Sequence, residues 1–529
     1  PLPHGRADPA GSVQAHSRML RGILTVGGWT LISRITGFAR DMLVAALMGA
    51  GPVADAFFVA LKLPNLFRRL FGEGAFNAAF VPAFSAALAA EGQEAARALA
   101  DRMLGLLTLW LMALTVAGWL AMPLLLFVLA NGFVGDPVRW PLAVEMTRIT
   151  FPYLVLICVT ALISGVLNGL GRFAAAAAAP VLFNLCAIAS LWLLRPFTGT
   201  PGHALAWGVT LSGGLQLALV WWAASRAGMR LIPRITVPDA KVKAVLRRMV
   251  PGVVGAGATQ LNLVLDVLIT SFLPAGSIAY LYYADRLAQL PLGVIGAAVG
   301  TALLPLLSRQ FSTGQPLSAH RTLNRAVEFS LVLVLPAAAA LMVCAVPLVD
   351  ALFRRGAFDD AAAAATSAAL VAYSAGLPAF VLVKTFAPGF FARGDTRTPV
   401  KIGLFTVALN LVLNLVLIRW LDHVGVALAT AISAWVNLAA LAALLARQGA
   451  FRADRRLRRR VPRMLVATAI MAATLWALAT ALFPADSLRL PRLGVLIAAG
   501  MISYFGAAQL LGAMEWRDLR GLRRRPQGA

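Results

Sequence analysis

The chain has 529 residues, of which 60% are hydrophobic and 13% are charged, and its mean hydropathy is +0.79. This composition is too apolar for a soluble globular protein and is typical of a polytopic membrane protein. A formal net charge of +25 would suggest nucleic-acid binding in a soluble domain. Here, however, the basic residues gather in short loops between apolar segments, which is the pattern of topology signals. The sequence therefore predicts no nucleic-acid partner.

Residues 1–23 are polar and basic, contain no cleavage site, and are predicted to form a cytoplasmic tail rather than a signal peptide. Fourteen apolar runs of about 20 residues follow, each long enough to cross a bilayer. The predicted spans are residues 24–48, 53–71, 104–130, 146–169, 176–195, 204–224, 249–273, 278–307, 326–351, 365–391, 400–418, 424–446, 461–483 and 491–513.

We therefore predict an all-α polytopic membrane protein of about 14 transmembrane helices, with two six-helix lobes around a central cavity and two extra helices. The predicted parts are an N-lobe (24–225), a basic cytoplasmic linker (226–248), a C-lobe (249–446), a basic loop with the two extra helices (447–513) and a basic cytoplasmic tail (514–529).

Residues 33–85 place charged side chains inside the first two apolar segments, where a charge costs about 2.5–3.5 kcal/mol on insertion scales. At about 100° per residue, Arg34, Gly37, Arg40 and Asp41 fall within one arc of about 120°. The rest of this helix is apolar. The pattern predicts that these side chains face a wet cavity.

The second segment repeats this arrangement, because Asp55 and Lys62 are seven residues apart and share a helical face. Pro64 then disturbs the helix, so either Arg68 or Arg69 joins the cavity. Intramembrane ionisable residues are functional by default.

A structural alternative needs no substrate. In that interpretation Asp41 pairs with Arg40, and Asp55 pairs with Lys62.

An internal repeat relates the first six spans to the next six. Asp41 and the residues that follow it match Asp266 and its followers 225 residues later, and Lys62 matches Arg286 at an offset of 224. A third match, GVLN with GFFA, has the same offset of 224. Because six spans separate equivalent helices, the two repeats are predicted to run parallel, related by an axis along the membrane normal.

The eighth span carries a stripe of small and polar residues within an arc of about 80°. These residues are Arg286, Gln289, Gly293, Gly296 and Gly300. The glycines alone are equally typical of helix packing, but packing does not require a charged residue. An ion pair with the adjacent Asp285 is a weak explanation for Arg286, since neighbouring helix residues point about 100° apart.

The distribution of Lys and Arg predicts the orientation. With the N-terminus inside, 34 of the 47 basic residues lie on cytoplasmic segments, 8 lie on external ones, and 5 lie within spans. Both termini and the Arg447–Arg463 loop are then cytoplasmic. The loop's arginines are interpreted as topology anchors near anionic lipid. The five basic residues within spans are Arg34, Arg40, Lys62, Arg286 and Lys384.

A cavity richer in bases than in acids suits a polyanion, and arginine in particular binds phosphate oxygens through its planar fork. Cys158, Cys186 and Cys344 lie in apolar stretches without metal-ligand spacing, and the chain contains no phosphate-binding GxxxxGK[ST] motif. The sequence therefore predicts no cofactor, no metal and no enzyme, but a transporter that works by alternating access.

Four long runs carry a family resemblance: SRITGFARD, ADAFFVALKLPNLFRRLFGEGAF, YYADRL and APGFFARGDTRTPVKI. They resemble the bacterial lipid II flippases of the MurJ (MviN) family, within the multidrug/oligosaccharidyl-lipid/polysaccharide exporter superfamily, over about residues 18 to 515. The resemblance implies a multi-pass protein of the bacterial inner membrane. It would move the undecaprenyl-pyrophosphate-linked peptidoglycan precursor from the cytoplasmic to the periplasmic leaflet, for cell-wall synthesis and cell shape.

Carried over residue by residue, the resemblance implies that the essential cavity arginines are Arg34, Arg40, Arg68 and Arg286 and that Asp55 is the acid of the first lobe; Lys62 and Glu73 also match. We therefore predict a substrate-binding set and a set for gating or ion pairing. The first is Arg34, Arg40, Arg68, Arg286, Lys62 and Asp55, and the second is Asp41, Glu73 and Asp285. The resemblance also implies that the two extra helices, at about 461–513, form a groove for the lipid tail. The implied partners are lipid II, membrane lipids and, as further candidates, peptidoglycan synthesis proteins.

Two alternatives stay open: an exporter of another polyprenyl-linked saccharide, and a non-transporting membrane scaffold of the cell-wall machinery. A drug or cation exporter would need an acidic or aromatic site, whereas this one is net basic. A membrane enzyme acting on polyprenyl phosphates would need clustered Asp or His at a membrane face, and the sequence has none.

Overall fold

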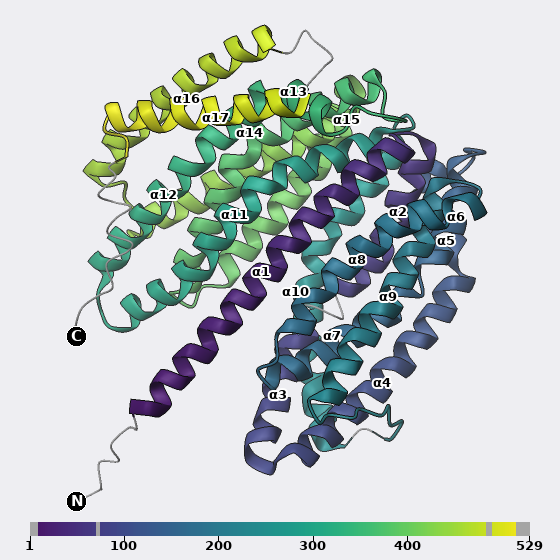
Figure 1. Ribbon diagram of the computed structural model, residues 1–529. Coiled ribbons are helices and arrows are strands. Elements are labelled where there is room, and N and C mark those ends of the chain that lie inside the picture. The colour runs from purple at the N-terminus through teal and green to yellow at the C-terminus, as the bar shows by residue number, and fades with distance from the viewer. Residues whose placement is uncertain (1–8, 70–74, 238, 483–488, 515–529) are drawn as a thin grey trace, which may run out of the picture. The chain divides into compact units, whose positions relative to one another are not determined.

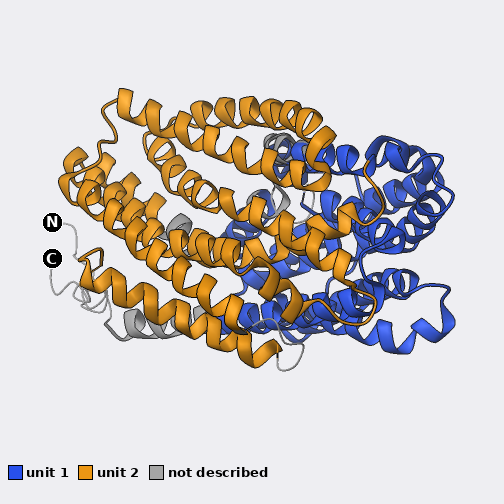
Figure 2. Ribbon diagram, turned by 90° about the horizontal axis from the view of Figure 1, so that it is seen from above, with its two compact units in different colours: residues 1–272 blue, residues 273–529 orange. Residues whose placement is uncertain are grey.

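The computed structural model describes residues 9–69, 75–237, 239–482 and 489–514, and every regular element within these ranges is a helix (Figure 1). The predicted all-α fold class is confirmed. The chain divides into two compact units, residues 1–272 and 273–529 (Figure 2).

Unit 1 contains ten α-helices and two short 3-10 turns among its described residues. In chain order they are α1 (Pro9–Met48), α2 (Pro52–Phe67), α3 (Ala75–Glu91), α4 (Gln93–Leu120), α5 (Met122–Leu129), η2 (Asn131–Phe133), α6 (Arg139–Thr150), α7 (Tyr153–Gly169), α8 (Ala174–Leu193), η3 (Arg195–Phe197), α9 (Pro201–Arg226) and α10 (Ala240–Ser271).

Unit 2 contains seven helices among its described residues. They are α11 (Ser277–Ser312), α12 (Pro316–Val343), α13 (Ala345–Leu352), α14 (Asp360–Phe391), α15 (Arg397–Arg447), α16 (Arg455–Leu482) and α17 (Arg489–Leu510). The last two lie side by side, as the yellow helices of Figure 1 show, and α16 also packs on α12.

Small residues lie where helices cross, as expected in a bilayer, where close backbone packing drives association. A Cβ on Gly208 of α9 would lie 2.2 Å from Oγ of Ser190 on α8. A Cβ on Gly376 of α14 would lie 2.8 Å from Cα of Ala431 on α15. Large apolar side chains point outward instead, with Ile502 exposed by 75%. This outward apolar surface suits contact with lipid.

The repeat is visible in element lengths. In unit 1, α4 has 28 residues and α5 has 8, with Ala121 alone between them. In unit 2, α12 and α13 also have 28 and 8 residues, with Cys344 alone between them. The joining residues have similar backbone angles, φ −87° and ψ 16° for Ala121 and φ −97° and ψ 20° for Cys344. Two segments far apart in the sequence therefore have the same local structure, a long helix and a short helix joined by a single residue.

α15 contains two predicted spans, 400–418 and 424–446, joined by a sharp reversal. Asp422 has φ 45° and ψ −129°, which is not helical. A Cβ on Gly425 would lie 2.7 Å from the carbonyl carbon of Leu417, although residues eight apart in a straight helix are about 12 Å apart. The two halves of α15 are therefore antiparallel.

Nine helical segments among the described residues are long and apolar enough to cross a membrane, with α6 and α7 counted together and α15 counted once. The helices are consistent with the fourteen predicted spans, and that count stays a prediction. Two helical stretches lie outside the predicted spans. Residues 75–91 form α3 despite Pro82, and α1 begins at Pro9, within the predicted tail, whose cytoplasmic location stays a prediction.

Along the sequence, the boundary between the two compact units lies after α10, between Phe272 and Leu273. The predicted lobes were defined by the repeat, which puts residues 249–273 in the second lobe, and their limits stay a prediction. In unit 1, α10 packs on α3, α4 and α5. The linker before it is anchored on α4, because Asp101 there accepts hydrogen bonds from Ile232 N–H at its Oδ1 (2.9 Å) and from Arg234 N–H at its backbone oxygen (3.0 Å).

Candidate functional site

Arg40 on α1 is held by two side chains in unit 1. Its Nη2 donates to Oδ1 of Asp41 (2.7 Å), and its Nη1 donates to Oδ1 of Asn184 on α8 (2.9 Å). Its Cζ lies 5.4 Å from the ring centroid of Phe183. This is the Arg40–Asp41 ion pair of the structural alternative. Although adjacent helix residues point about 100° apart, the long arginine side chain bends back far enough to meet its neighbour.

Asn184 orients this arginine and ties α8 to α1. Its Nδ2 donates to the backbone oxygen of Ser33 (2.9 Å) and to Oγ1 of Thr36 (3.2 Å). A Cβ on Gly37 would lie 3.2 Å from the same Nδ2, so Gly37 leaves room for the amide. Sequence reasoning missed Asn184. The available signal was an asparagine within an apolar span, since polar residues there bond across helices.

Arg34 lies on α1 but takes no part in this cluster. It is exposed, whereas Gly37 and Arg40 face α8. Among the described residues it has no hydrogen bond or ion pair. The α1 residues predicted to share one arc of about 120° therefore have different surroundings. Gly37 and Arg40 pack on α8, whereas Arg34 is exposed.

On α2, Asp55 is fully buried and Lys62 is half-buried. Asp55 lies in the first turn of the helix, where the partial positive charge of the helix N-terminus stabilises a carboxylate. This gives a structural reason for one buried acid. The pairing of Asp55 with Lys62 stays a prediction.

The end of α2 distinguishes the two candidate arginines. Arg68 is half-buried and donates from Nε to Oδ1 of Asn65 (3.2 Å), whereas Arg69 is exposed. Arg68 is thus the more enclosed of the pair. Pro64 lies inside α2, as expected. Glu73 lies outside the described residues.

In unit 2, Arg286 lies on α11 with its Cζ 4.8 Å from the ring centroid of Tyr282, a favourable cation–π geometry. Asp285 accepts a hydrogen bond from Gln289 Nε2 one turn further along. Arg286 is half-buried and Gln289 is exposed. The polar part of the predicted stripe therefore contains an arginine stacked on a tyrosine and an amide that donates to the neighbouring Asp285.

The glycine part of that stripe accommodates a lysine from α14. A Cβ on Gly296 would lie 3.0 Å from Cδ and 3.2 Å from Nζ of Lys384. A side chain at Gly296 would require Lys384 to shift by a few tenths of an ångström. Lys384 was recognised as a basic residue within a span but not as a site residue. Lys384 lies beside Gly296 because α14 packs on α11. This helix pairing could not be predicted from the sequence.

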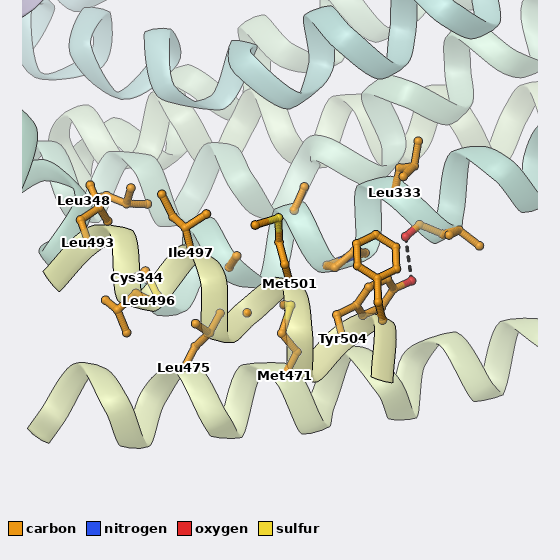
Figure 3. A pocket seen from close by; sticks show the side chains of 16 residues that line it. Leu333, Cys344, Leu348, Met471, Leu475, Leu493, Leu496, Ile497, Met501 and Tyr504 are labelled. Atoms are coloured by element: carbon orange, nitrogen blue, oxygen red, sulfur yellow. Dashed lines mark hydrogen bonds between the residues drawn. The ribbon is translucent and has the colours of Figure 1, made fainter. Parts of the chain in front are cut away.

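A cavity of about 240 Å³ lies between α12, α13, α16 and α17 (Figure 3). Its walls are almost entirely apolar. Figure 3 shows Leu348 and Leu493 at one end and Tyr504 at the other. The Tyr504 hydroxyl donates to the backbone oxygen of Val332 (2.7 Å), which satisfies the polar group of that wall. We call this cavity, with the residues that line it, the apolar groove.

A buried carboxylate fixes α16 against α12. Glu328 on α12 accepts hydrogen bonds from Arg325, from Arg456 (Nη2 to Oε1, 3.1 Å) and from Arg460. Glu328 and Arg460 are each only 6% exposed. Asp454 also accepts from Arg325. The arginines of the Arg447–Arg463 loop are thus partly engaged inside the protein, and a role of the others near anionic lipid stays a prediction.

The fold is similar to that of two solved structures. It resembles the structure titled lipid II flippase MurJ, inward closed conformation, with a TM-score of 0.78 and 24% identity, covering 94% of this chain and 99% of that one. It also resembles an inward-facing MATE family multidrug transporter of the MOP superfamily, with a TM-score of 0.67 and 16% identity, covering 80% and 94%. The chain therefore shares the fold of these two solved structures.

Sequence comparison identifies the family. The family model described as lipid II flippase MurJ matches residues 44–488. A probable lipid II flippase MurJ of Rhizobium meliloti (strain 1021) is 43% identical, over 95% of this chain and 96% of the relative. Another probable lipid II flippase MurJ, from Vibrio cholerae serotype O1, is 37% identical over 96% of this chain and 99% of the relative. The chain belongs to the MurJ family of lipid II flippases.

Proposed function

We propose that this protein is a lipid II flippase of the bacterial inner membrane. It translocates the undecaprenyl-pyrophosphate-linked peptidoglycan precursor from the cytoplasmic to the external leaflet by alternating access, without covalent chemistry. Family membership supports this function. Peptidoglycan synthesis proteins, which would consume the product, are candidate partners.

The structural observation that carries the proposal is the set of cations on helices that are otherwise apolar. Arg34 on α1 is exposed, Arg68 on α2 is half-buried, Arg286 lies over Tyr282 on α11, and Lys384 lies over Gly296. Such charges are costly in hydrocarbon, so their retention argues for an anionic ligand. A pyrophosphate is suited to arginine because each guanidinium can donate two parallel hydrogen bonds.

Within this proposal the residues have different roles. Arg34, Arg68 and Arg286, with Lys62, bind the pyrophosphate and the peptide carboxylates. Arg40 contributes its charge from a fixed position. Asp55 tunes the site from the first turn of α2. Three further acids, Asp41, Asp285 and Glu73, act in gating or ion pairing.

The apolar groove is proposed to hold part of the undecaprenyl tail. It is lined by the two extra helices, α16 and α17, and by α12 and α13. A groove on this side of unit 2 lets the tail remain in apolar surroundings while the charged head moves. The Glu328 cluster supports this role by fixing α16 on α12.

The membrane potential is the proposed source of energy. An anionic head that moves outward leaves the negative interior, which yields about 2.3 kcal/mol per charge per 100 mV. We expect an ionophore that collapses the potential at constant ATP to stop the appearance of lipid II in the external leaflet. Undiminished flipping under that condition would contradict this energy source.

The function itself is tested by a leaflet-accessibility assay for lipid II in cells depleted of the protein. External lipid II should fall while cytoplasmic lipid II accumulates, and re-expression should restore both. Unchanged external lipid II in depleted cells that contain no second flippase would refute the proposal. Restoration by Arg419→Gln, an exposed basic position at the end of the eleventh predicted span, serves as the control.

A further inference from the structure

Pro336 interrupts the backbone hydrogen bonds of α12 in the wall of the apolar groove. Proline has no backbone N–H, so a proline inside a helix leaves the carbonyl four residues earlier without its intrahelical donor. Pro336 lies inside α12, and the carbonyl concerned is that of Val332. Both residues line the groove. An unpaired carbonyl here would be a polar group in an apolar wall.

Tyr504 on α17 supplies the missing donor. Its hydroxyl donates to the backbone oxygen of Val332 at 2.7 Å, and the residue is only 2% exposed. Of the 16 described residues that line the groove, Tyr504 alone carries a hydroxyl group. Figure 3 shows this hydrogen bond as a dashed line at the Tyr504 end of the groove. The hydroxyl of the lining therefore pairs with the carbonyl that Pro336 leaves without its helical partner.

The equivalent position in unit 1 differs in both respects. Counted back from the residue that joins the long and the short helix, the eighth position is Pro336 in α12 and Ala113 in α4. By the same count Val332 corresponds to Leu109, which is 49% exposed, whereas Val332 is 8% exposed. The proline and the cover over it therefore occur together, in the half of the chain that carries α16 and α17.

The hydrogen bond also joins α17 to α12 across the groove. α17 packs on α16 and α13, and Tyr504 and Val332 belong to one buried apolar cluster with Met471 and Leu475 of α16. A hydroxyl–carbonyl bond of 2.7 Å has a narrow range of favourable lengths. It therefore fixes the separation of α17 from α12 at this end of the groove.

A second proline has the same arrangement away from the groove. Pro64 lies inside α2, and the carbonyl four residues earlier is that of Ala60. Thr150 on α6 donates its hydroxyl to this oxygen (3.2 Å) and to the backbone oxygen of Thr147 (3.2 Å). Hydroxyls of neighbouring helices satisfy carbonyls that proline frees in membrane helices. Thr150 is therefore a matched control for Tyr504, with the same chemistry at another place.

The position of the Tyr504 bond has a consequence for an apolar ligand. Without the hydroxyl, the Val332 carbonyl would be unpaired or bound to water. An apolar chain that enters the groove would displace this water without replacing its hydrogen bond, which weakens binding. Phenylalanine at this position would keep the shape of the wall but make the groove less favourable for such a chain.

We propose that Tyr504 is a positioning residue for the lipid tail. Its hydroxyl gives α12 the hydrogen bond that Pro336 removes, holds α17 at its distance from α12, and so keeps this part of the wall apolar. The inference rests on the proposed function for the identity of the tail. It gives α17 a role beyond lining the groove, because this helix supplies a donor that α12 lacks.

The test is a double-mutant cycle on the full purified chain in detergent, with undecaprenol as the probe and native mass spectrometry as the measurement of its affinity. Tyr504→Phe should weaken undecaprenol binding by at least about fivefold, because a buried carbonyl without a donor is costly. Pro336→Ala restores the backbone N–H. In that background Tyr504→Phe should change the affinity by less than about twofold.

Thr150→Val is the control, because it removes the corresponding hydroxyl from the Pro64 site in unit 1. It should lower the Tm, as Tyr504→Phe does, and should change undecaprenol affinity by less than about twofold. The Tm of each variant separates a loss of folded protein from a loss of binding. If Pro336→Ala does not fold, the comparison of Tyr504→Phe with Thr150→Val decides.

Three outcomes would overturn the proposal. They are an unaltered chain that does not bind undecaprenol, an equal loss of affinity in Thr150→Val and Tyr504→Phe, and an equal effect of Tyr504→Phe in the unaltered and Pro336→Ala backgrounds. The proposed function is judged separately, by external lipid II in depleted cells. A chain that flips lipid II without the coupling of Tyr504 to Pro336 refutes the positioning role alone, and one that shows the coupling without flipping refutes the proposed function alone.

Discussion

At the scale of single residues, the chain stabilises two membrane arginines in different ways. Arg40 has an acid and an amide as fixed partners, Asp41 at 2.7 Å and Asn184 at 2.9 Å. Arg286 lies on an aromatic ring, Tyr282, at 4.8 Å. The ring stabilises the cation through its quadrupole. We keep Arg286 as our candidate for direct contact with a phosphate.

Replacement of Arg286 should show whether the planar fork is required. Arg286→Lys keeps the charge but loses bidentate geometry, and Arg286→Ala loses both. We expect both variants to lower lipid II transport by at least about tenfold, since a hydrogen bond to a charged group contributes about 1.5–3 kcal/mol. Complementation of growth in depleted cells measures the effect, and immunodetection of folded protein in the membrane is the control. Rescue by lysine would instead assign Arg286 a purely electrostatic role.

Asp136 predicts a pH-dependent contribution to stability outside the spans. Its Oδ1 accepts from the backbone N–H of Arg139 (2.9 Å) and of Val138 (2.9 Å), and these bonds, with Arg139 Nε on Oδ2, hold the pKa of Asp136 below its usual value of 3.8. Because the pKa is lower when folded, the stabilisation is present above pH 3.8 and is lost as the pH falls through the depressed value. The difference in Tm between the unaltered chain and Asp136→Asn should be constant down to about pH 5 and shrink in more acidic buffer. A difference that grows on acidification would contradict the sign.

At the scale of elements, the attachment of α16 to α12 depends on Glu328. Glu328→Gln keeps the shape but removes the carboxylate that accepts the hydrogen bond of the buried Arg460, and breaking a buried pair costs about 3–5 kcal/mol. Arg456 and Arg325 are more exposed, so we expect the lower end of that range. Proteolysis at the α16–α17 pair should accelerate, and the Tm should fall.

Arg458→Gln is the matched control for this element, because Arg458 is on the same helix but is exposed. It should leave the proteolysis rate and the Tm unchanged. An equal effect of both variants would mean that the net charge of the helix, not the Glu328 cluster, holds α16 in place.

Sequence reasoning predicted helices well where hydrophobicity alone decides. The apolar runs that became α4, α8, α9 and α14 were found because length and composition suffice in a bilayer. Hydrophobicity gave no indication of α3, a helix outside the predicted spans that packs on α10 and α4 despite Pro82.

The candidate site was predicted less completely, because partners across helices cannot be read from spacing. Charged residues in the spans were visible, including Arg40 and Asp41. Asn184, 144 residues away from Arg40, and Lys384 beside Gly296 required knowledge of which helices pack together. The Arg40–Asp41 pair, which the structural alternative predicted, is present, so adjacent helix residues can pair when one side chain is long.

At the scale of the whole molecule, the charge distribution predicts which ends face the cytoplasm. In a variant with Cys158, Cys186 and Cys344 replaced by serine, Arg458→Cys should react with an impermeant thiol reagent only in inverted vesicles. Arg419→Cys should react in intact spheroplasts. Both side chains are exposed, so accessibility within the protein does not limit either reaction. Labelling of Arg458→Cys from outside would refute the fourteen-span topology.

The reversal at Asp422 has a consequence for how the protein enters its membrane. If straight, the 51 residues of α15 would extend about 76 Å, more than twice the hydrocarbon thickness of about 30 Å. No loop separates its two halves. The second half can therefore fold antiparallel to the first during synthesis, and the two halves can leave the translocon together as a hairpin. Only a few residues around Arg419 and Asp422 would then have to be carried across the bilayer during biogenesis.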